Sequence, residues 1–216
     1  MSRKKFFLRN QINLDIHNKC TLECSHCARV FLLKRYTTSN FPGCPLTDSD
    51  WKKILDHYTN INFCGQIADP MMHLKLSKFL SDMYAENKVG NVHTAISHKP
   101  MKYFIKAFKA NPNMKWNFGI DGLPKDSHKY RINQDGEKLF KTMLESKKYL
   151  NTRPIWQYIV FKYNENDIEE AKQMAKDNNL ILELQKSSRF WKDDPLMPKN
   201  KDYYIERKSY ENPTKV

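Results

Sequence analysis

The chain has 216 residues, of which 40% are hydrophobic and 12% are aromatic, and its formal net charge is +13. This length and apolar content predict one folded domain with a sizeable core and exclude a disordered protein. No apolar run approaches the roughly 18 residues of a membrane span, and the apolar stretch near the N-terminus is too short for a signal peptide. We therefore expect a soluble, cytoplasmic protein with no membrane partner.

The positive charge is spread along the chain. Residues 1–40 carry a net charge of +6, and residues 91–130 carry a net charge of +5. Such an excess favours binding to RNA, DNA or another anionic substrate. The alternative is a basic surface that only contacts solvent.

Strand patterns and helix patterns alternate along the chain. Strands are predicted where apolar residues alternate or β-formers cluster, and helices where apolar residues recur on one face. In chain order, we expect a strand at 11–17, a helix at 47–58, a strand at 61–64, a helix at 76–84, a strand at 92–96, a helix at 101–108, a strand at 116–120, a helix at 139–150, a strand at 155–161, a helix at 166–175 and a strand at 180–184. Asn166 is the expected cap of the last helix. The segment after the first strand reads as a loop.

Six strands with five intervening helices predict an α/β fold with a mainly parallel sheet and outer helices. A closed eight-stranded barrel usually needs about 250 residues, so a partial (β/α)6 TIM-like barrel fits better. A doubly wound open sheet is the alternative, but the glycine-rich phosphate loop expected after its first strand is missing. We expect a basic extension at 1–10, a core domain at 11–190, and a basic tail at 191–216 that either packs over the barrel mouth or is partly disordered.

Three of the five cysteines, Cys20, Cys24 and Cys27, fall within eight residues after the first predicted strand. Thiolates are soft ligands that suit iron–sulfur clusters, zinc or Cu(I). A [4Fe–4S] cluster usually takes four cysteines, so three without an obvious fourth imply an iron with an open position. A substrate or cofactor can bind at such a position.

Two other readings of these cysteines stay open. Their spacing would place them on one face of a helix as buried core residues, although their polar neighbours make poor core companions. A structural zinc site is the second reading, because Cys44, Cys64, His17 or His26 could complete four ligands. Zinc sites more often carry a second CxxC or an HxxxH, and neither is present.

The CxxxCxxC motif, in its place after the first strand of a βα barrel, resembles that of the radical SAM (S-adenosylmethionine) superfamily. Residues 63–70 are similar to its Gly-Gly-Glu-Pro segment, although Asp69 replaces the usual Glu, and residues 92–95 are similar to its Thr-Asn segment. Residues 118–122 with Tyr130 and Arg131 resemble the peptide-modifying SPASM/twitch branch. Residues 161–164 and 186–190 resemble short bacterial and bacteriophage radical SAM proteins, so the resemblance covers about residues 11–190.

The resemblance implies that Cys20, Cys24 and Cys27 hold a [4Fe–4S] cluster whose fourth iron is chelated by SAM. One electron from a flavodoxin- or ferredoxin-type donor would cleave SAM to methionine and a 5′-deoxyadenosyl radical, which would take hydrogen from a substrate. The implied SAM-binding residues are His26, Gly65, Asp69, Thr94, Ser97, Asp121, Arg131 and Lys186. Each has a structural alternative as a loop, turn, strand-end or solvated residue, and Arg131 could instead pair with Asp126 or Asp135.

The substrate class stays open between two alternatives. The segments at 118–122 and 130–131 favour a peptide or protein. The charge, and the absence of cysteines after Cys64 for an auxiliary cluster, favour a nucleotide or nucleic acid. Cys64 itself is either a buried cysteine or a neighbour of bound SAM. The competing function is a zinc-stabilised nucleic-acid-binding module without catalysis.

Overall fold

The computed structural model describes residues 10–36, 43 and 45–206, and these form one parallel sheet of six strands with outer helices. The strands are paired in chain order, each with the next. They are β1 (Gln11–Leu14), β2 (Asn60–Phe63), β3 (Asn91–Thr94), β4 (Lys115–Gly119), β5 (Ile155–Ile159) and β6 (Ile181–Gln185). The predicted partial (β/α)6 barrel is confirmed. Of the predicted basic extension at 1–10, only Asn10 lies within the described residues.

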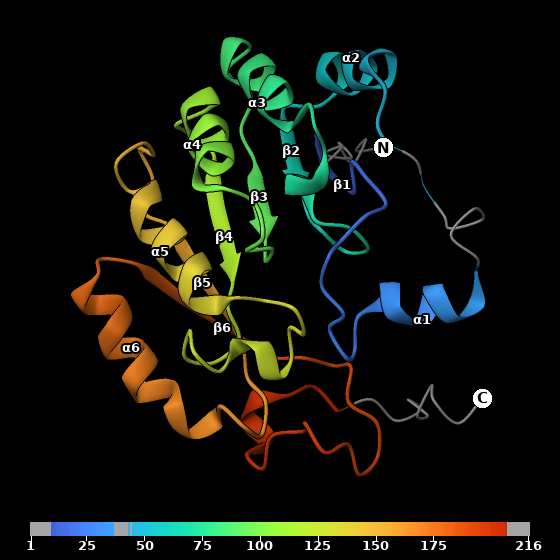
Figure 1. The fold of residues 1–216 in the computed structure, drawn as a ribbon. Coiled ribbons are helices and arrows are strands. Elements are labelled where there is room, and N and C mark those ends of the chain that lie inside the picture. The colour runs from blue at the N-terminus through green and yellow to red at the C-terminus, as the bar shows by residue number, and fades with distance from the viewer. Residues whose placement is uncertain (1–9, 37–42, 44, 207–216) are drawn as a thin grey trace, which may run out of the picture.

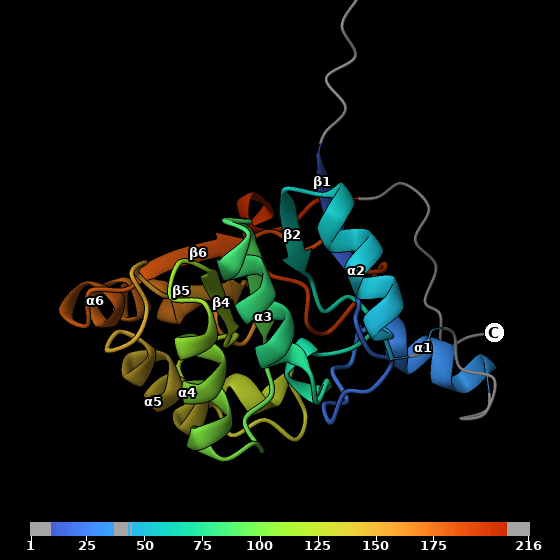
Figure 2. The same ribbon diagram turned by 90° about the horizontal axis from the view of Figure 1, so that it is seen from above.

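Five helices connect consecutive strands and form an arc outside the sheet (Figures 1 and 2). They are α2 (Asp48–His57), α3 (Leu76–Ala85), α4 (Met101–Ala110), α5 (Gly136–Ser146) and α6 (Ile168–Asp177). Each turns its apolar residues toward the sheet, as α3 does with Leu76, Phe79, Leu80 and Met83. None of the described helices is long and apolar enough to cross a membrane.

The two faces of the sheet differ in chemistry because successive side chains of a strand point to opposite faces. The outer face is apolar and buried under the helices; it includes Ile61, Phe63, Val92, Trp116, Phe118, Trp156 and Tyr158. The inner face carries a row of uncharged polar side chains, Asn13, Asn62, Asn91, His93, Asn117 and Gln157, with Lys115 and Glu183 as charged residues on the same face. The inner face of a closed barrel is instead a packed apolar core.

Hydrogen bonds link this inner row across the strands. Asn62 Nδ2 donates to Asn13 Oδ1 at 2.9 Å, and Asn91 Nδ2 donates to Asn62 Oδ1 at 2.9 Å. His93 Nδ1 lies 3.3 Å from Gln157 Oε1. The amides thus satisfy one another, which holds the inner face polar without burying charge.

A sixth helix, α1 (Ala28–Arg35), follows the cysteines where the sequence predicts a loop. None of its side chains is buried, so it lacks the periodic apolar face by which helices are recognised. The predicted cap of α6 is also wrong. That helix begins at Ile168 after a short 3₁₀ turn (Glu165–Asp167), so Asn166 lies before its start.

The C-terminal residues 187–206, which we call the C-terminal strap, pack at the end of the barrel where the strands have their carboxyl ends (Figure 1). Ser187 pairs with Tyr204, and the Lys162 amide donates to the Leu196 carbonyl at 2.9 Å. The strap ends in a short 3₁₀ turn (Lys201–Tyr203). Packing over the barrel mouth, one of the two alternatives for the tail, therefore describes residues up to 206, and residues 207–216 lie outside the described chain.

Candidate functional site

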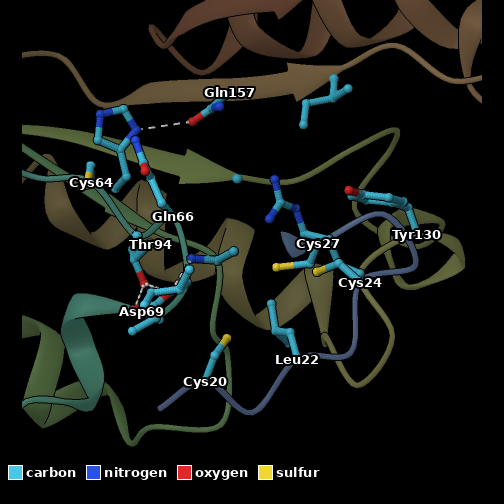
Figure 3. A pocket seen from close by; sticks show the side chains of 18 of the residues that line it. Cys20, Leu22, Cys24, Cys27, Cys64, Gln66, Asp69, Thr94, Tyr130 and Gln157 are labelled. Atoms are coloured by element: carbon cyan, nitrogen blue, oxygen red, sulfur yellow. Dashed lines mark hydrogen bonds between the residues drawn. The ribbon is translucent and has the colours of Figure 1, made fainter. Parts of the chain in front are cut away.

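A cavity of about 190 Å³ opens at the carboxyl ends of the strands. Its walls come from the cysteine loop, the loops after β2 and β3, and the ends of β4 and β5 (Figure 3). Arg189, at the start of the strap, also lines it. Seven of the predicted site residues line it: Cys20, Cys24, Cys27, Gly65, Asp69, Thr94 and Arg131. The fold therefore gathers these residues from distant parts of the sequence around one space.

The three motif cysteines direct their sulfur atoms into this cavity (Figure 3). The Cys27 amide donates to the Cys24 carbonyl at 3.0 Å, and this turn leads directly into α1. Within the described residues, no three His, Cys, Asp or Glu side chains lie close enough together to hold a metal ion. Thiols that point into one cavity are the ligands that an iron–sulfur cluster takes, so the three cysteines fit such a cluster in kind and orientation. The three side chains are nevertheless farther apart here than the ligands of a bound metal ion.

The ionisation of these thiols depends on their burial. Burial, with a smaller contribution from the nearby Asp69 carboxylate, raises the pKa of Cys20 to about 12. Burial also raises the pKa of Cys24 to about 11, against the opposing effect of Arg131. Because metal ligation requires thiolates, binding of a cluster would release protons from this loop.

The loop after β2 is shaped by one glycine and two carboxylates. Gly65 has a φ of +61°, and an added Cβ would lie 3.0 Å from the Ala68 carbonyl oxygen, so a larger residue would be strained there. Asp15 accepts hydrogen bonds from the Ile67 and Ala68 amides at 3.3 Å each. Burial raises the pKa of Asp15, and these amides oppose that rise.

Asp69 joins this loop to the loop after β3. Its buried carboxylate accepts hydrogen bonds from Thr94 Oγ1 at 3.0 Å, the Ala95 amide at 2.8 Å and the Ile96 amide at 3.2 Å. These bonds end β3 at Thr94, two residues before its predicted end, because the next two amides leave the strand ladder. Asp69 and Thr94 thus hold the cavity wall in addition to lining it.

Asp121 and Arg131 form a buried ion pair beside the cavity. Arg131 Nε lies 2.8 Å from Asp121 Oδ2, and the other carboxylate oxygen accepts from the Ile159 amide at 2.7 Å. Burial raises the pKa of Asp121, and the guanidinium opposes that rise. Arg131 therefore pairs with Asp121, whereas the sequence left Asp126 or Asp135 as its partner.

Four of the predicted SAM-binding residues are not among those that line the cavity: His26, Ser97, Asp121 and Lys186. His26 is buried under the strap beside Asp194, and burial lowers its pKa against the opposing effect of that carboxylate. Ser97 Oγ accepts from the Asp135 amide at 2.8 Å. Lys186 is exposed.

Three structural residues of the site were missed by sequence reasoning: Asp15, Gly119 and Gln134. Gln134 Nε2 donates to the Ala95 carbonyl at 2.6 Å and to the Gly119 carbonyl at 2.9 Å, so it ties the ends of β3 and β4 together. The loop that carries Gln134 has no periodic pattern. The position of Asp15 just after the first strand is the one local signal that could have found any of the three.

The cavity has a second end that is polar and uncharged. Cys64, Gln66 and Gln157 line it on the side away from Cys24 and Cys27 (Figure 3). His93, which lies 3.3 Å from Gln157, also lines the cavity. His93 and Gln157 belong to the inner row of the sheet, so the cavity continues into the concave face of the partial barrel. Cys44, a candidate zinc ligand, lies outside the described residues.

The comparisons with known proteins support the fold alone. No protein-family model and no curated protein matches the sequence. Solved structures do match: SuiB of Streptococcus suis bound to S-adenosylmethionine has a TM-score of 0.67 at 11% identity, over 88% of this chain and 43% of that one. The chain anSMEcpe with bound AdoMet has a TM-score of 0.59 at 14% identity, over 81% and 50%. Methylornithine synthase (PylB) has a TM-score of 0.58 at 13% identity, over 81% and 52%.

These neighbours are radical SAM enzymes. The chain has the radical SAM fold. This confirms the resemblance seen in the sequence at the level of the fold, and it agrees with the position of the cysteine motif after β1. The chain spans about half the length of these neighbours or less.

Proposed function

We propose that this protein is a radical SAM enzyme with one [4Fe–4S] cluster held by Cys20, Cys24 and Cys27. The observation that carries the proposal is the convergence of these three thiols on a cavity at the carboxyl ends of a partial barrel of the radical SAM fold. When bound, the cluster would supply the electron that cleaves SAM to methionine and a 5′-deoxyadenosyl radical.

The residues around the cavity have separate roles in this proposal. Arg131 brings a guanidinium to the cavity wall, where it suits the carboxylate of SAM. Asp121 holds that guanidinium in place from behind. Asp15 accepts hydrogen bonds from amides of the loop after β2, and Asp69 accepts them from amides of the loop after β3, so this wall is fixed before a ligand binds. Burial of the cavity among strands and strap limits the access of water to a reactive radical.

We propose a peptide or protein as the substrate, in preference to a nucleotide or nucleic acid. The row of amides and one imidazole on the inner face supports this choice, because it offers hydrogen-bond donors and acceptors. The charged residues of the same face are Glu183, which would repel phosphate groups, and Lys115, which begins β4 at the end of the sheet away from the cavity. One structural neighbour, SuiB, has been solved bound to its precursor peptide SuiA.

Anaerobic reconstitution tests the function. Loaded protein should contain about four irons and four sulfides per chain and, with SAM and a strong reductant, should release 5′-deoxyadenosine. Cys24→Ala should lose both the cluster and the cleavage, whereas Cys64→Ala, a cysteine of the same cavity outside the motif, should keep its iron. Protein that takes up one zinc and no iron would instead support the non-catalytic nucleic-acid-binding module.

A further inference from the structure

The strap crosses the cysteine loop at His26, one of the two residues between Cys24 and Cys27. His26 has 3% of its surface exposed, and its ring lies 4.5 Å from the ring of Trp191 and 6.0 Å from that of Tyr130. Phe190 of the strap contacts the same ring at 6.1 Å. The family resemblance implied that His26 faces SAM, but its ring is enclosed by side chains of this chain.

Asp194 of the strap makes the one charged contact to this ring among the described residues. Its Oδ2 lies 2.8 Å from His26 Nε2, and its side chain is fully buried. Its Oδ1 accepts from the Leu196 amide at 2.9 Å. A buried carboxylate is costly unless it is paired, so these two contacts specify where both the strap and the ring lie.

The strap has anchors of its own that do not involve the cysteine loop. The Ile205 amide donates to the Ser187 carbonyl at 3.0 Å, and the Lys199 amide donates to Glu165 Oε2 at 2.9 Å. The first of these contacts closes the strap on itself, and the second, together with the bond from Lys162 to Leu196, fixes the strap to the segment between β5 and α6. These contacts hold the strap, and with it Asp194, in place independently of the contact between Asp194 and His26.

We propose that Asp194 is a positioning residue that acts through His26 to hold the cysteine loop in the shape that receives the cluster. Fixing the ring between Cys24 and Cys27 limits the conformations of both thiols before any metal binds, which lowers the entropy lost on binding. The role in cluster binding rests on the proposed function. The order of the loop does not, because it is a property of the metal-free chain.

Hydrogen–deuterium exchange of the full-length, metal-free protein tests the positioning. Asp194→Asn removes the charge opposite His26, and the matched control Asp193→Asn makes the same change at an exposed neighbour whose φ of +62° suits Asn. We expect amides 22–27 to exchange about tenfold faster in Asp194→Asn and at the wild-type rate in Asp193→Asn. His26→Phe keeps an aromatic ring and loses Nε2, so its amides 22–27 should also exchange faster than in wild type. This variant tests the proposal if Asp194→Asn does not fold.

Iron retention gives a second readout. In reconstituted protein, EDTA should bleach the cluster faster in Asp194→Asn and His26→Phe than in wild type and Asp193→Asn, because a looser loop releases its ligands more often. Unchanged exchange at 22–27 in both variants would overturn the proposal, as would an equal effect of Asp193→Asn. Failure of every variant, wild type included, to take up iron would refute the proposed function and leave the exchange result to decide the positioning.

Discussion

At Gly119 the side chain of Arg131 packs directly against the sheet. An added Cβ would lie 2.7 Å from Arg131 Nη2 and 2.9 Å from its Cζ, far inside contact distance. The guanidinium cannot retreat freely, because Asp121 holds it at 2.8 Å. Glycine at this position therefore serves the placement of Arg131 and not a turn.

We expect Gly119→Ala to move Arg131 and to weaken SAM binding about tenfold, the cost of one charge-assisted hydrogen bond, with the fold retained. Equilibrium dialysis of SAM with the reconstituted protein measures the affinity, and far-ultraviolet circular dichroism checks the fold. Arg131→Lys should weaken binding in the same way. If Arg131→Lys weakens SAM binding and Gly119→Ala does not, Arg131 accommodates the added methyl group without losing its contact, and the predicted role of Gly119 is wrong.

Within the described chain, Asp121 is the one carboxylate that forms an ion pair with Arg131, and both side chains are largely buried. We expect Asp121→Asn to lower the free energy of unfolding by about 3 kcal/mol, because it leaves a buried guanidinium without its counter-charge. Urea unfolding measures the change. Asp126→Asn is the control: its partner Lys129 is nearly half exposed, so the cost should stay below about 1 kcal/mol. Equal costs for the two variants would contradict a structural role for the buried pair.

The helices differ in how much of the fold depends on them. α3 packs Phe79 against Trp51 of α2, with ring centroids 4.6 Å apart and Phe79 fully buried. α1 has no buried side chain and stands apart from the arc of helices (Figure 1). The periodic apolar pattern that made α3 predictable is the same feature that makes it a part of the core, and α1 lacks both.

We therefore expect Phe79→Ala in α3 to cost about 3 to 5 kcal/mol of unfolding free energy, because it opens a cavity in the core. Phe31→Ala in α1 should cost less than about 1 kcal/mol, since Phe31 is only partly covered. Urea unfolding of both variants under the same conditions measures the two changes in unfolding free energy. A large cost for Phe31→Ala would show that α1 contributes to the core.

At the scale of the whole molecule, the core lies between the outer face of the sheet and the helices. The cysteine loop and the strap meet at one end of this sheet. The cavity between them is built by β-strand ends and loops, so a ligand bound there bridges the loop to the barrel. Binding to the folded state alone raises the free energy of unfolding. Cluster loading should therefore stabilise the entire fold.

We expect the melting temperature of the wild-type protein to rise by several degrees on anaerobic cluster loading, and that of Cys24→Ala to stay unchanged. Without the cluster, Cys24→Ala and wild type should melt within a few degrees of each other, because the barrel does not depend on this thiol. Thermal unfolding followed by circular dichroism under anaerobic conditions measures both. Equal shifts in the two proteins would show that the added iron binds elsewhere.

The sequence by itself determined the order of strands and helices and the position of the cysteine motif, because these features are local. Alternation and helical periodicity are carried by neighbouring residues, as in 76–84, and the motif spans only residues 20–27. The resemblance to the radical SAM superfamily rested on short segments of the same kind. Most strand ends came within two residues, and the errors lie where a side chain such as Asp69 captures the backbone.

Only the tertiary structure decided which of these residues meet. It paired Arg131 with Asp121, placed Gly119 under the guanidinium, and turned His26 away from the cavity toward Asp194. Each of these is a contact between segments distant in sequence, and its geometry follows from the packing of the barrel. No local pattern encodes such a contact, because the cost of burying a charge is relieved by whichever opposite charge the fold brings near.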